Sequence, residues 1–317
     1  MKSNDVVWIT GAHGFIGRHL AQELSLKGKA VYGIGHGAWT QGEAKSSGVT
    51  GWLNGEISGN NLSELRALGG EPFCVFHLAG GSSVGVAISQ PKEDFTRTVS
   101  TTMELLEWVR QQAPHTLVVA VSSAAVYGAG HAGPIPETTI PNPYSPYGYH
   151  KLIMESLCRS YGSTFGVRSV IARLFSVYGS GLKKQLLFDL CSSLKRDSLA
   201  VVLGGSGGEL RDWTDVRDVA RILGEIVPMA AMDAPVLNVG RGQGVSVGEV
   251  AAYVVRSWAE GVANYAKVSF SGITRTGDPF SLIAETTKQL RGELVCEISP
   301  EAGIADYVSW FKREYAA

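Results

Sequence analysis

The N-terminal part of the chain joins a short apolar run to closely spaced glycines and then to a helix-like stretch. The run Val6–Thr10 predicts a buried strand, the turn Gly-Ala-His-Gly-Phe-Ile-Gly follows it, and residues 18–27 predict a helix. Gly11 permits the tight strand-to-helix turn, Gly14 lets a pyrophosphate approach the backbone, and Gly17 lets the helix pack closely on the sheet. Because free amide groups at a helix N-terminus attract phosphates, the pattern predicts a dinucleotide site.

Strand-like runs alternate with helix-like stretches over the first half of the chain. The predicted strands span residues 6–10, 30–34, 73–78, 117–121 and 169–174. Alternation of this kind implies right-handed crossovers and a parallel sheet covered by helices on both faces, which is a doubly wound α/β fold.

The pattern becomes irregular beyond Gly179. Residues 182–194 and 247–259 read as helices, and residues 267–270 read as a short strand. Ser246, followed three residues later by a glutamate, predicts a capping box at the start of the second helix.

Composition excludes several classes of protein. The 317 residues carry a net charge of −1, which provides no electrostatic footprint for nucleic acid or an anionic membrane. The four cysteines stand singly, so buried free thiols are expected in preference to disulfides or a metal site. The first strand starts by Val6, leaving no room for a signal peptide, and no apolar run reaches the ~18 residues of a membrane span. We therefore expect a cytoplasmic protein without metal.

Three residues in the middle of the chain form a candidate acid–base set. Tyr147 and Lys151 stand one helical turn apart, and Ser123 follows the apolar run 117–121. A lysine ammonium on the same helix face lowers the pKa of a phenol, ordinarily near ~10, electrostatically. The pair favours proton transfer to or from oxygen, although the spacing alone also arises by chance on solvated helices.

Six motifs occur in an order that resembles the extended short-chain dehydrogenase/reductases acting on nucleotide sugars. They are the glycine turn, Ser-Ser-Ala-Ala-Val-Tyr-Gly at 122–128, Ser-Pro-Tyr-Gly-Tyr-His-Lys at 145–151, Arg-Leu-Phe-Ser-Val-Tyr-Gly at 173–179, Arg-Asp-Trp-Thr-Asp-Val-Arg-Asp-Val at 211–219, and Arg-Thr-Gly-Asp-Pro at 275–279. The likeness covers the whole chain.

This resemblance implies a two-lobed protein. A dinucleotide-binding Rossmann domain would take residues 1–178, with return segments near 215–240, and a smaller mixed α/β substrate lobe would take mainly 179–317. It also implies an NAD(P) cofactor, a nucleotide-diphosphate sugar as substrate, and a homodimer formed through helices at 94–111 and 147–161.

The resemblance also assigns chemical roles. Tyr147 would move a proton, Lys151 would hold down the pKa of the tyrosine and bond the nicotinamide ribose, and Ser123 would orient the reacting oxygen. Family register favours Ser123 over its neighbour Ser122, and Lys151 lies off the helix face of the competing Tyr149.

Other positions of the family motifs are expected to contact ligands. The expected cofactor contacts are Gly11, Gly14, Phe15, Ile16, Gly17, Gly35, His36, Glu56, Ile57, Ala79, Gly80, Gly81, Tyr147 and Lys151. The expected substrate contacts are Ser83, Ser123, Ser176, Arg211 and Arg275. Two positions depart from the family pattern, because Ser176 and Thr98 stand where asparagines are usual. His77, inside a predicted strand, reads as a core residue with its hydrogen bonds satisfied.

The end of the second strand bears on the choice of cofactor. Chains that prefer NAD carry a carboxylate there, which bonds the adenosine ribose and repels a 2′-phosphate. Here the position is Gly35, which leaves space for a phosphate, and His36 follows as either a phosphate donor or an exposed loop residue. Arg18 is a further candidate contact. The sequence therefore favours NADP, with NAD as the alternative.

The residues after the catalytic serine bear on the reaction. Family members that dehydrate sugars carry an acidic pair there, whereas this chain has Ala124 and Ala125. Reduction of a keto sugar and epimerisation with retained NAD, of the 4-epimerase type, both stay open. The electrostatics at Gly35 favour reduction slightly. A non-catalytic NAD(P)-binding scaffold or sensor is a minor alternative, disfavoured because the serine, tyrosine and lysine are all present.

Overall fold

The structure is a computed structural model that describes residues 5–196, 200–259, 267–273 and 278–315. The chain divides into two compact units. The first comprises Met1–Gly128, Glu137–Leu174 and Ala220–Val239, and the second comprises Ala129–Pro136, Phe175–Val219 and Gly240–Ala317. Helix α9 (Val216–Glu225) therefore begins in the second unit and ends in the first.

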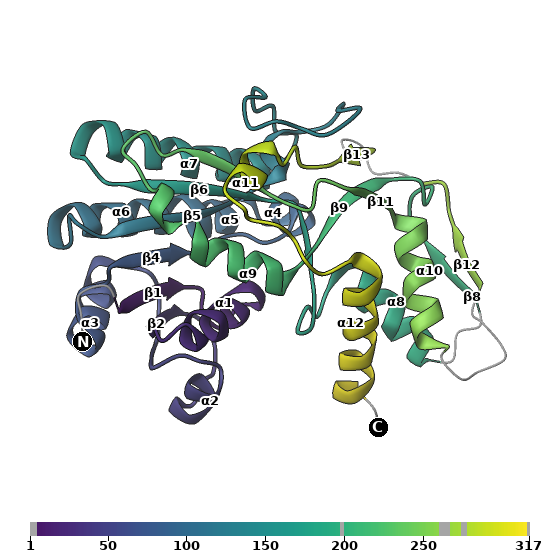
Figure 1. The fold of residues 1–317 in the computed structure, drawn as a ribbon, viewed down its shortest axis with the longest axis horizontal. Coiled ribbons are helices and arrows are strands. Elements are labelled where there is room, and N and C mark those ends of the chain that lie inside the picture. Colours follow the sequence, from purple (N-terminus) through teal and green to yellow (C-terminus); the bar gives the residue numbers. More distant parts are fainter. Residues whose placement is uncertain (1–4, 197–199, 260–266, 274–277, 316–317) are drawn as a thin grey trace. The chain divides into compact units, whose positions relative to one another are not determined.

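The first unit is built on a seven-stranded sheet in the order β10-β6-β5-β4-β1-β2-β3, with every neighbouring pair parallel (Figure 1). The strands are β1 (Val6–Thr10), β2 (Ala30–Gly35), β3 (Gly51–Asn54), β4 (Cys74–His77), β5 (Leu117–Ser123), β6 (Ser169–Leu174) and β10 (Val236–Val239). This order confirms the doubly wound Rossmann-like α/β fold. Strand order reverses between β1 and β4, and ligands of such sheets bind at the carboxyl edge beside that reversal.

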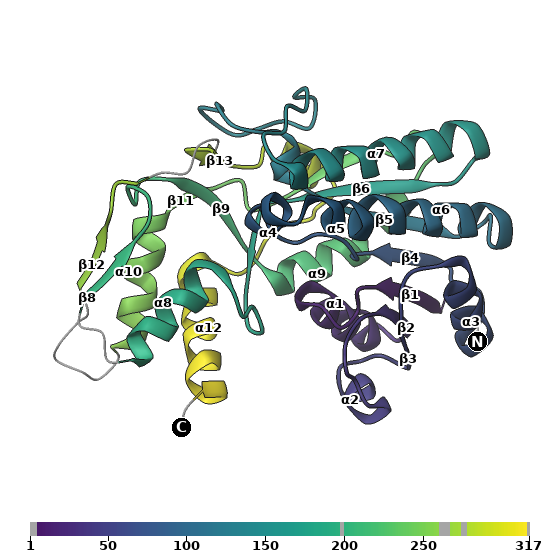
Figure 2. The same cartoon turned by 180° about the vertical axis from the view of Figure 1, so that it is seen from behind.

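Helices cover both faces of this sheet. They are α1 (Phe15–Leu26), α2 (Gln41–Ser46), α3 (Gly59–Gly69), α4 (Val84–Ser89), α5 (Pro91–Phe95), α6 (Thr101–Gln112) and α7 (Pro146–Phe165), with short turns at η2 (Ala124–Val126) and η3 (Val227–Met229). Helices α6 and α7 pack side by side on the face seen in Figure 2. On the other face, the end of α9 lies beside α1, where Lys27 Nζ is 3.5 Å from Glu225 Oε1.

The main core fills the space between the sheet and helices α3, α6 and α7. Its centre includes Trp8 of β1 and Trp108 of α6, whose ring centroids are 5.1 Å apart. The single helix expected from residue 94 to 111 is interrupted by a π-helical turn, η1 (Thr96–Ser100). Such turns re-aim side chains and are frequent at functional sites.

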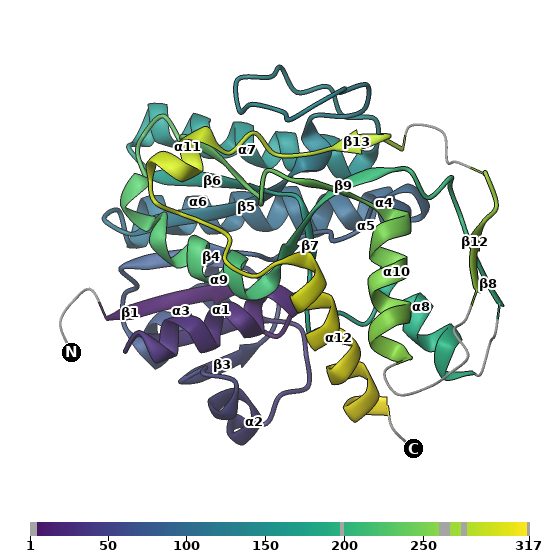
Figure 3. The ribbon, with the colours of Figure 1, turned by 45° about the vertical axis from the view of Figure 1, so that its right-hand side comes forward.

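The second unit contains two small sheets and a helical cluster. β7 (Ser176–Tyr178), β9 (Leu210–Asp215), β11 (Gly244–Ser246) and β13 (Ser281–Leu282) form one sheet, and β8 (Ala200–Leu203) and β12 (Lys267–Phe270) form the other. Helix α10 (Val247–Trp258) packs against α8 (Gln185–Lys195) and α12 (Pro300–Tyr315), as Figure 3 shows, and α11 (Thr287–Arg291) is short. The capping box predicted at Ser246 is confirmed, whereas α8 starts three residues later than expected.

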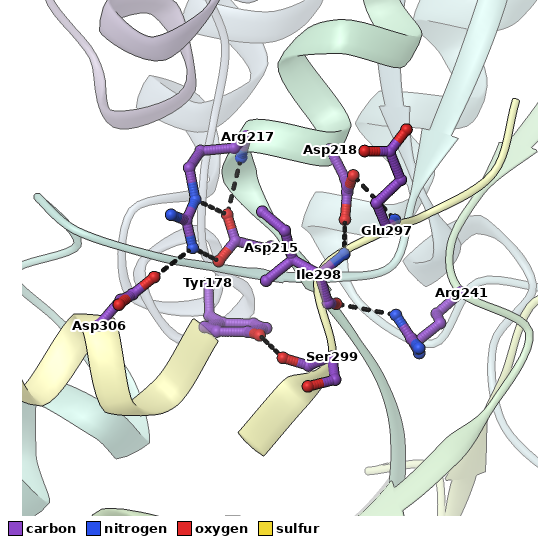
Figure 4. A network of polar contacts seen from close by, with 9 residues as sticks. All are labelled: Tyr178, Asp215, Arg217, Asp218, Arg241, Glu297, Ile298, Ser299 and Asp306. Atoms are coloured by element: carbon purple, nitrogen blue, oxygen red, sulfur yellow. Dashed lines mark hydrogen bonds and ion pairs between the residues drawn. The ribbon is translucent and has the colours of Figure 1, made fainter. Parts of the chain in front are cut away.

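A polar network in the second unit ties the C-terminal helix to β9 (Figure 4). Arg217 donates to Asp215 at the end of β9 and, over 2.9 Å, to Asp306 of α12. The carboxylate of Asp218 accepts hydrogen bonds from the consecutive backbone amides of residues 297–298, just before α12. The segment that leads into α12 is therefore fixed by buried carboxylates.

All four cysteines are free and buried, as predicted. Within the described ranges, every helix is too short or too polar to cross a bilayer.

Candidate active site

The glycine turn after β1 forms a cradle at the start of α1, the place where dinucleotides bind in folds of this type. Gly11 has a φ of 75°, in the left-handed region, and its carbonyl oxygen accepts a bond from the amide of Gly14 over 2.9 Å. A Cβ atom on Gly17 would lie 2.4 Å from that same oxygen, so the tight turn excludes a side chain there. Helix α1 starts at Phe15, and within the described chain no side chain caps its first turn. Its amide groups are thus available to a pyrophosphate.

Several other predicted cofactor residues lie at the same carboxyl edge of the sheet. An ideal Cβ on Gly35 would be 3.3 Å from the Gly11 amide, and one on Gly11 would be 3.1 Å from the Ala79 amide. Glu56 and Ile57 follow the end of β3, which pairs with β2 in parallel, so they also lie at the carboxyl edge of the sheet. The structure thus brings the glycine turn together with the loops that follow β2 and β4.

The two expected contacts to a 2′-phosphate, His36 and Arg18, lie in different surroundings. His36 is exposed, whereas Arg18 is held by His13, donating to its carbonyl oxygen over 2.9 Å and contacting its Nε2 at 2.6 Å. The Arg18 guanidinium also lies over the Trp39 ring, 4.7 Å from the centroid. Partial burial lowers the pKa of both Arg18 and His13. Arg18 is therefore held in place by neighbouring side chains, whereas His36 is exposed.

The structure brings together the three residues of the candidate acid–base set. Ser123 ends β5, and its hydroxyl hydrogen-bonds the Tyr147 phenol. Tyr147 lies in the first turn of α7, which Ser145 caps by accepting from a backbone amide over 3.3 Å. Lys151, one turn on, is buried, and its Nζ donates to the carbonyl oxygen of Val121 over 2.9 Å.

The pKa values of this set differ from the sequence expectation. Burial raises the pKa of Tyr147 above its ordinary value, the hydrogen bond with Ser123 opposes the rise, and the charge of Asp94 adds to it. Burial lowers the pKa of Lys151 to about 8, against the charges of Asp94 and Glu155. The pKa of Tyr147 is therefore raised overall and not lowered as expected, because desolvation and the charge of Asp94 raise it, and the Lys151 ammonium is 6.0 Å from the ring centroid.

The two competing residues are engaged elsewhere or exposed. Ser122 donates over 2.7 Å to Glu155, which is fully buried and paired with Arg173. Tyr149 is half exposed, at 51% of its surface. Both observations agree with the choice of Ser123 and Tyr147.

Sequence reasoning missed a second polar pair beside this set. Asp94 of α5 is buried, and its Oδ2 lies 2.5 Å from His150 Nδ1 on α7. Thr98, in the π-helical turn, accepts a bond from the Gly81 amide over 2.8 Å. A pair separated by 56 residues leaves no local pattern, and only the position of His150 directly before Lys151 hinted at a role.

The predicted substrate contacts lie in both units. In the first, Ser83 caps α4, accepting from a backbone amide over 3.3 Å. In the second, Ser176 starts β7, and Arg211 of β9 donates to its neighbour's carbonyl oxygen over 2.9 Å. Arg275 lies outside the described residues.

Comparisons with known proteins agree with these features. The model of the NAD dependent epimerase/dehydratase family matches residues 7–240. The UDP-glucose 4-epimerase of Azospirillum brasilense is 29% identical over 298 residues, covering 88% of this chain and 83% of that protein. The GDP-6-deoxy-D-mannose reductase of Pseudomonas aeruginosa is 30% identical over 223 residues, covering 67% of each.

A solved structure extends the likeness to three dimensions. MoeE5, in complex with UDP-glucuronic acid and NAD, has a TM-score of 0.83 and 30% identity, covering 97% of this chain and 99% of that one. Together with the family match, this confirms the resemblance drawn from the motifs. The chain belongs to the NAD-dependent epimerase/dehydratase family of the extended short-chain dehydrogenase/reductases.

Proposed function

We propose that this chain is a nucleotide-sugar 4-epimerase that keeps NAD bound through its catalytic cycle. The observation that carries the proposal is the hydrogen bond between Ser123 and Tyr147, with Lys151 buried one turn away, at the sheet edge that holds the glycine cradle. The relatives add support, since UDP-glucose 4-epimerases are prominent among them. The sequence alone favoured reduction slightly, and these relatives tip the balance toward the alternative.

The residues after Ser123 support epimerisation over dehydration. Elimination of a sugar hydroxyl needs a base and an acid beside the reacting ring. Ala124 is buried and Ala125 follows it, so neither position supplies an ionisable group. The chain is thereby suited to a reversible oxidation at one carbon.

The proposed mechanism assigns one task to each residue. Bound NAD supplies the hydride acceptor and donor. Tyr147 takes the proton from the sugar hydroxyl and returns it after the ring has turned, while Ser123 holds the reacting oxygen. Lys151 bonds the nicotinamide ribose and supplies the positive charge that favours ionisation of a phenol whose pKa burial has raised. Arg211 and Ser176 are proposed to bind the nucleotide diphosphate, with Ser83 beside the sugar.

One observation favours a second candidate, reduction of a keto sugar by NADPH. The end of β2 carries Gly35 in place of a carboxylate, and the Arg18 guanidinium is ordered against His13 near that end. A cation and the lack of a carboxylate suit a 2′-phosphate. The reductase among the relatives agrees with this candidate.

Two incubations separate the two candidates, one without added cofactor and one with NADPH and a 4-keto sugar. The purified protein is incubated with UDP-glucose or UDP-glucuronic acid without added cofactor, and the sugars are identified by NMR, with Tyr147→Phe as the matched control. We expect the C4 epimer from the wild type alone, and NAD in the supernatant after denaturation. A protein that releases no nicotinamide nucleotide, forms no epimer and consumes NADPH with a 4-keto sugar would establish reduction instead.

We also propose that the protein is a homodimer through α6 and α7. Met103 of α6 is 49% exposed and Ile153 of α7 is 39% exposed, and Phe95 of α5 adds an exposed ring beside them. Exposed apolar side chains on adjacent helices are typical of helix-pair interfaces. Sedimentation of Ile153→Glu should report monomers, with Leu26→Glu on α1 as the control that stays dimeric. A dimeric Ile153→Glu would remove this face from the interface.

A further inference from the structure

Asp94 and His150 form a buried polar pair one residue from the lysine of the acid–base set. The side chain of Asp94 is 2% exposed and that of His150 is 12% exposed, and the atoms Oδ2 and Nδ1 are 2.5 Å apart. The ring of Phe95 packs edge-on against the imidazole at 5.4 Å between centroids. A carboxylate this deeply buried is stable only with a hydrogen-bonding partner, so the pair joins α5 firmly to α7.

The other oxygen of Asp94 occupies the space beside Gly81. An ideal Cβ on Gly81 would lie 1.7 Å from Asp94 Oδ1, so any side chain at position 81 would displace the carboxylate. The neighbouring Gly80 faces the catalytic lysine, because its ideal Cβ would be 3.2 Å from Lys151 Nζ. The Asp94 carboxylate, the Gly80–Gly81 loop and Lys151 therefore pack against one another.

The remaining ionisable groups around these residues are paired or buried. Facing Lys151 are Asp94, Glu155 and His77. Glu155 is neutralised by Arg173 and Arg159, and His77 is held neutral between two threonines. On the outer side of α5, Glu93 pairs with Arg97, and both are exposed. Asp94 is thus a buried carboxylate whose hydrogen-bond partner is His150 and whose charge acts on both the Tyr147 phenol and the Lys151 ammonium.

We propose that Asp94 and His150 are a positioning dyad that locks the Gly80–Gly81 loop against α7 and holds the Asp94 carboxylate beside Tyr147 and Lys151. This inference rests on the proposed function of those two residues. The charge raises the pKa of both the phenol and the ammonium. It therefore favours the charged form of Lys151 and the protonated form of Tyr147, and it sets the pH range in which the phenol can accept and return a proton.

The charge is tested with Asp94→Asn, which retains an oxygen to accept from His150 and removes only the charge. Removing a negative charge lowers the pKa of both groups, so both limbs of the pH profile of kcat/KM should move to lower pH. A variant in which the substitution only disturbs the packing would have a lower kcat/KM at every pH, with the two apparent pKa values of the profile unchanged. Limbs that stay in place would overturn the proposal.

The lock is tested with two substitutions at position 150. His150→Leu leaves the buried carboxylate without its donor, so kcat and NAD affinity should each fall by ~10-fold with little change in the KM for the sugar. His150→Asn can place an amide donor where Nδ1 lies, and it should restore both to within ~3-fold of the wild type. Equal behaviour of the two variants would overturn the lock.

One measurement keeps this test independent of the substrate. The ultraviolet absorbance of tyrosinate is titrated in the holoprotein, and the curve for the Tyr147→Phe variant is subtracted to isolate Tyr147. The same subtraction in the Asp94→Asn background should move the Tyr147 titration to lower pH. If the wild type turned over no nucleotide sugar but this shift occurred, the proposed function would fail and the dyad would stand. A Tyr147 titration that stays at the same pH in the Asp94→Asn background would contradict the proposed dyad.

Discussion

The Lys151 ammonium lies 6.0 Å from the centroid of the Tyr147 ring, although the two residues share one face of α7. The lysine bonds a backbone carbonyl oxygen of β5 and the tyrosine bonds a serine hydroxyl, so each is held by the strand and neither directly by the other. The strand end, as much as the helix, therefore fixes the spacing of the proposed proton-transfer pair.

Tyr147→Phe should abolish turnover while leaving cofactor affinity nearly unchanged, because the ring packs in both proteins and only the hydroxyl can carry out the proposed proton transfer. Loss of a positioned general acid or base typically costs ~100- to 10,000-fold in rate. Steady-state kinetics and NAD titration measure the two effects. Turnover like that of the wild type would take Tyr147 out of the mechanism.

Lys151→Met should make the protein more stable near neutral pH, although we expect it to remove activity. The pKa of Lys151 is about 8 in the fold and ordinarily 10.5, so the unfolded chain binds the extra proton between these values. Stability of the wild type therefore rises with pH across this window, and below it the buried cation costs on the order of 3 kcal/mol. Urea unfolding should show the advantage of the variant shrinking between pH 8 and pH 10.5. An advantage independent of pH would contradict the shift.

His77 should contribute to acid unfolding. Burial, with a smaller effect from Lys151, lowers its pKa from 6.5 to about 3, so the unfolded chain binds its proton first as the pH falls. The free energy of unfolding should therefore decrease from pH 6.5 toward pH 3, by roughly 5 kcal/mol at most. His77→Gln, which cannot titrate, should flatten this decrease. Parallel curves for the two proteins would exclude His77 as the cause.

The preference for NADPH or NADH can be tested at Gly35, but the backbone conformation there makes a second variant necessary as a control. Gly35 has a φ of 151°, which other residues rarely adopt, so Gly35→Asp and Gly35→Ala should both be strained. Only the aspartate adds charge, and two charges ~4 Å apart repel by roughly 1 to 4 kcal/mol. If a 2′-phosphate binds there, the NADPH to NADH affinity ratio should be at least ~5-fold lower in Gly35→Asp than in Gly35→Ala. Equal ratios would place the phosphate elsewhere or favour NAD.

The sequence predicted the parts of the fold that depend on local pattern. Strand, glycine turn and helix at the N-terminus, the capping box at Ser246 and the spacing of Tyr147 and Lys151 are all short-range features, and the structure has each of them. The π-helical turn around Thr98 was not predicted, because a turn that is one residue wider than an α-helical turn has no distinctive amino-acid composition.

The electrostatics of the site could not be predicted, because burial decides their sign. The helical spacing indicated a lowered pKa for Tyr147, whereas desolvation raises it. Likewise, Asp94 meets His150 only because α5 and α7 pack together, and no spacing along the chain encodes that contact.

The outermost strand of the large sheet has a consequence for how the protein is made. β10 pairs with β6, yet 61 residues of chain separate Leu174 from Val236, and most of them belong to the second unit. During synthesis on the ribosome, the edge of β6 that faces away from β5 therefore has no partner strand until residues 236–239 have emerged. An exposed parallel strand edge invites pairing with other chains. Truncation before Val236 should yield aggregates, so the shortest soluble Rossmann fragment of this protein has to include residues from far beyond its apparent boundary.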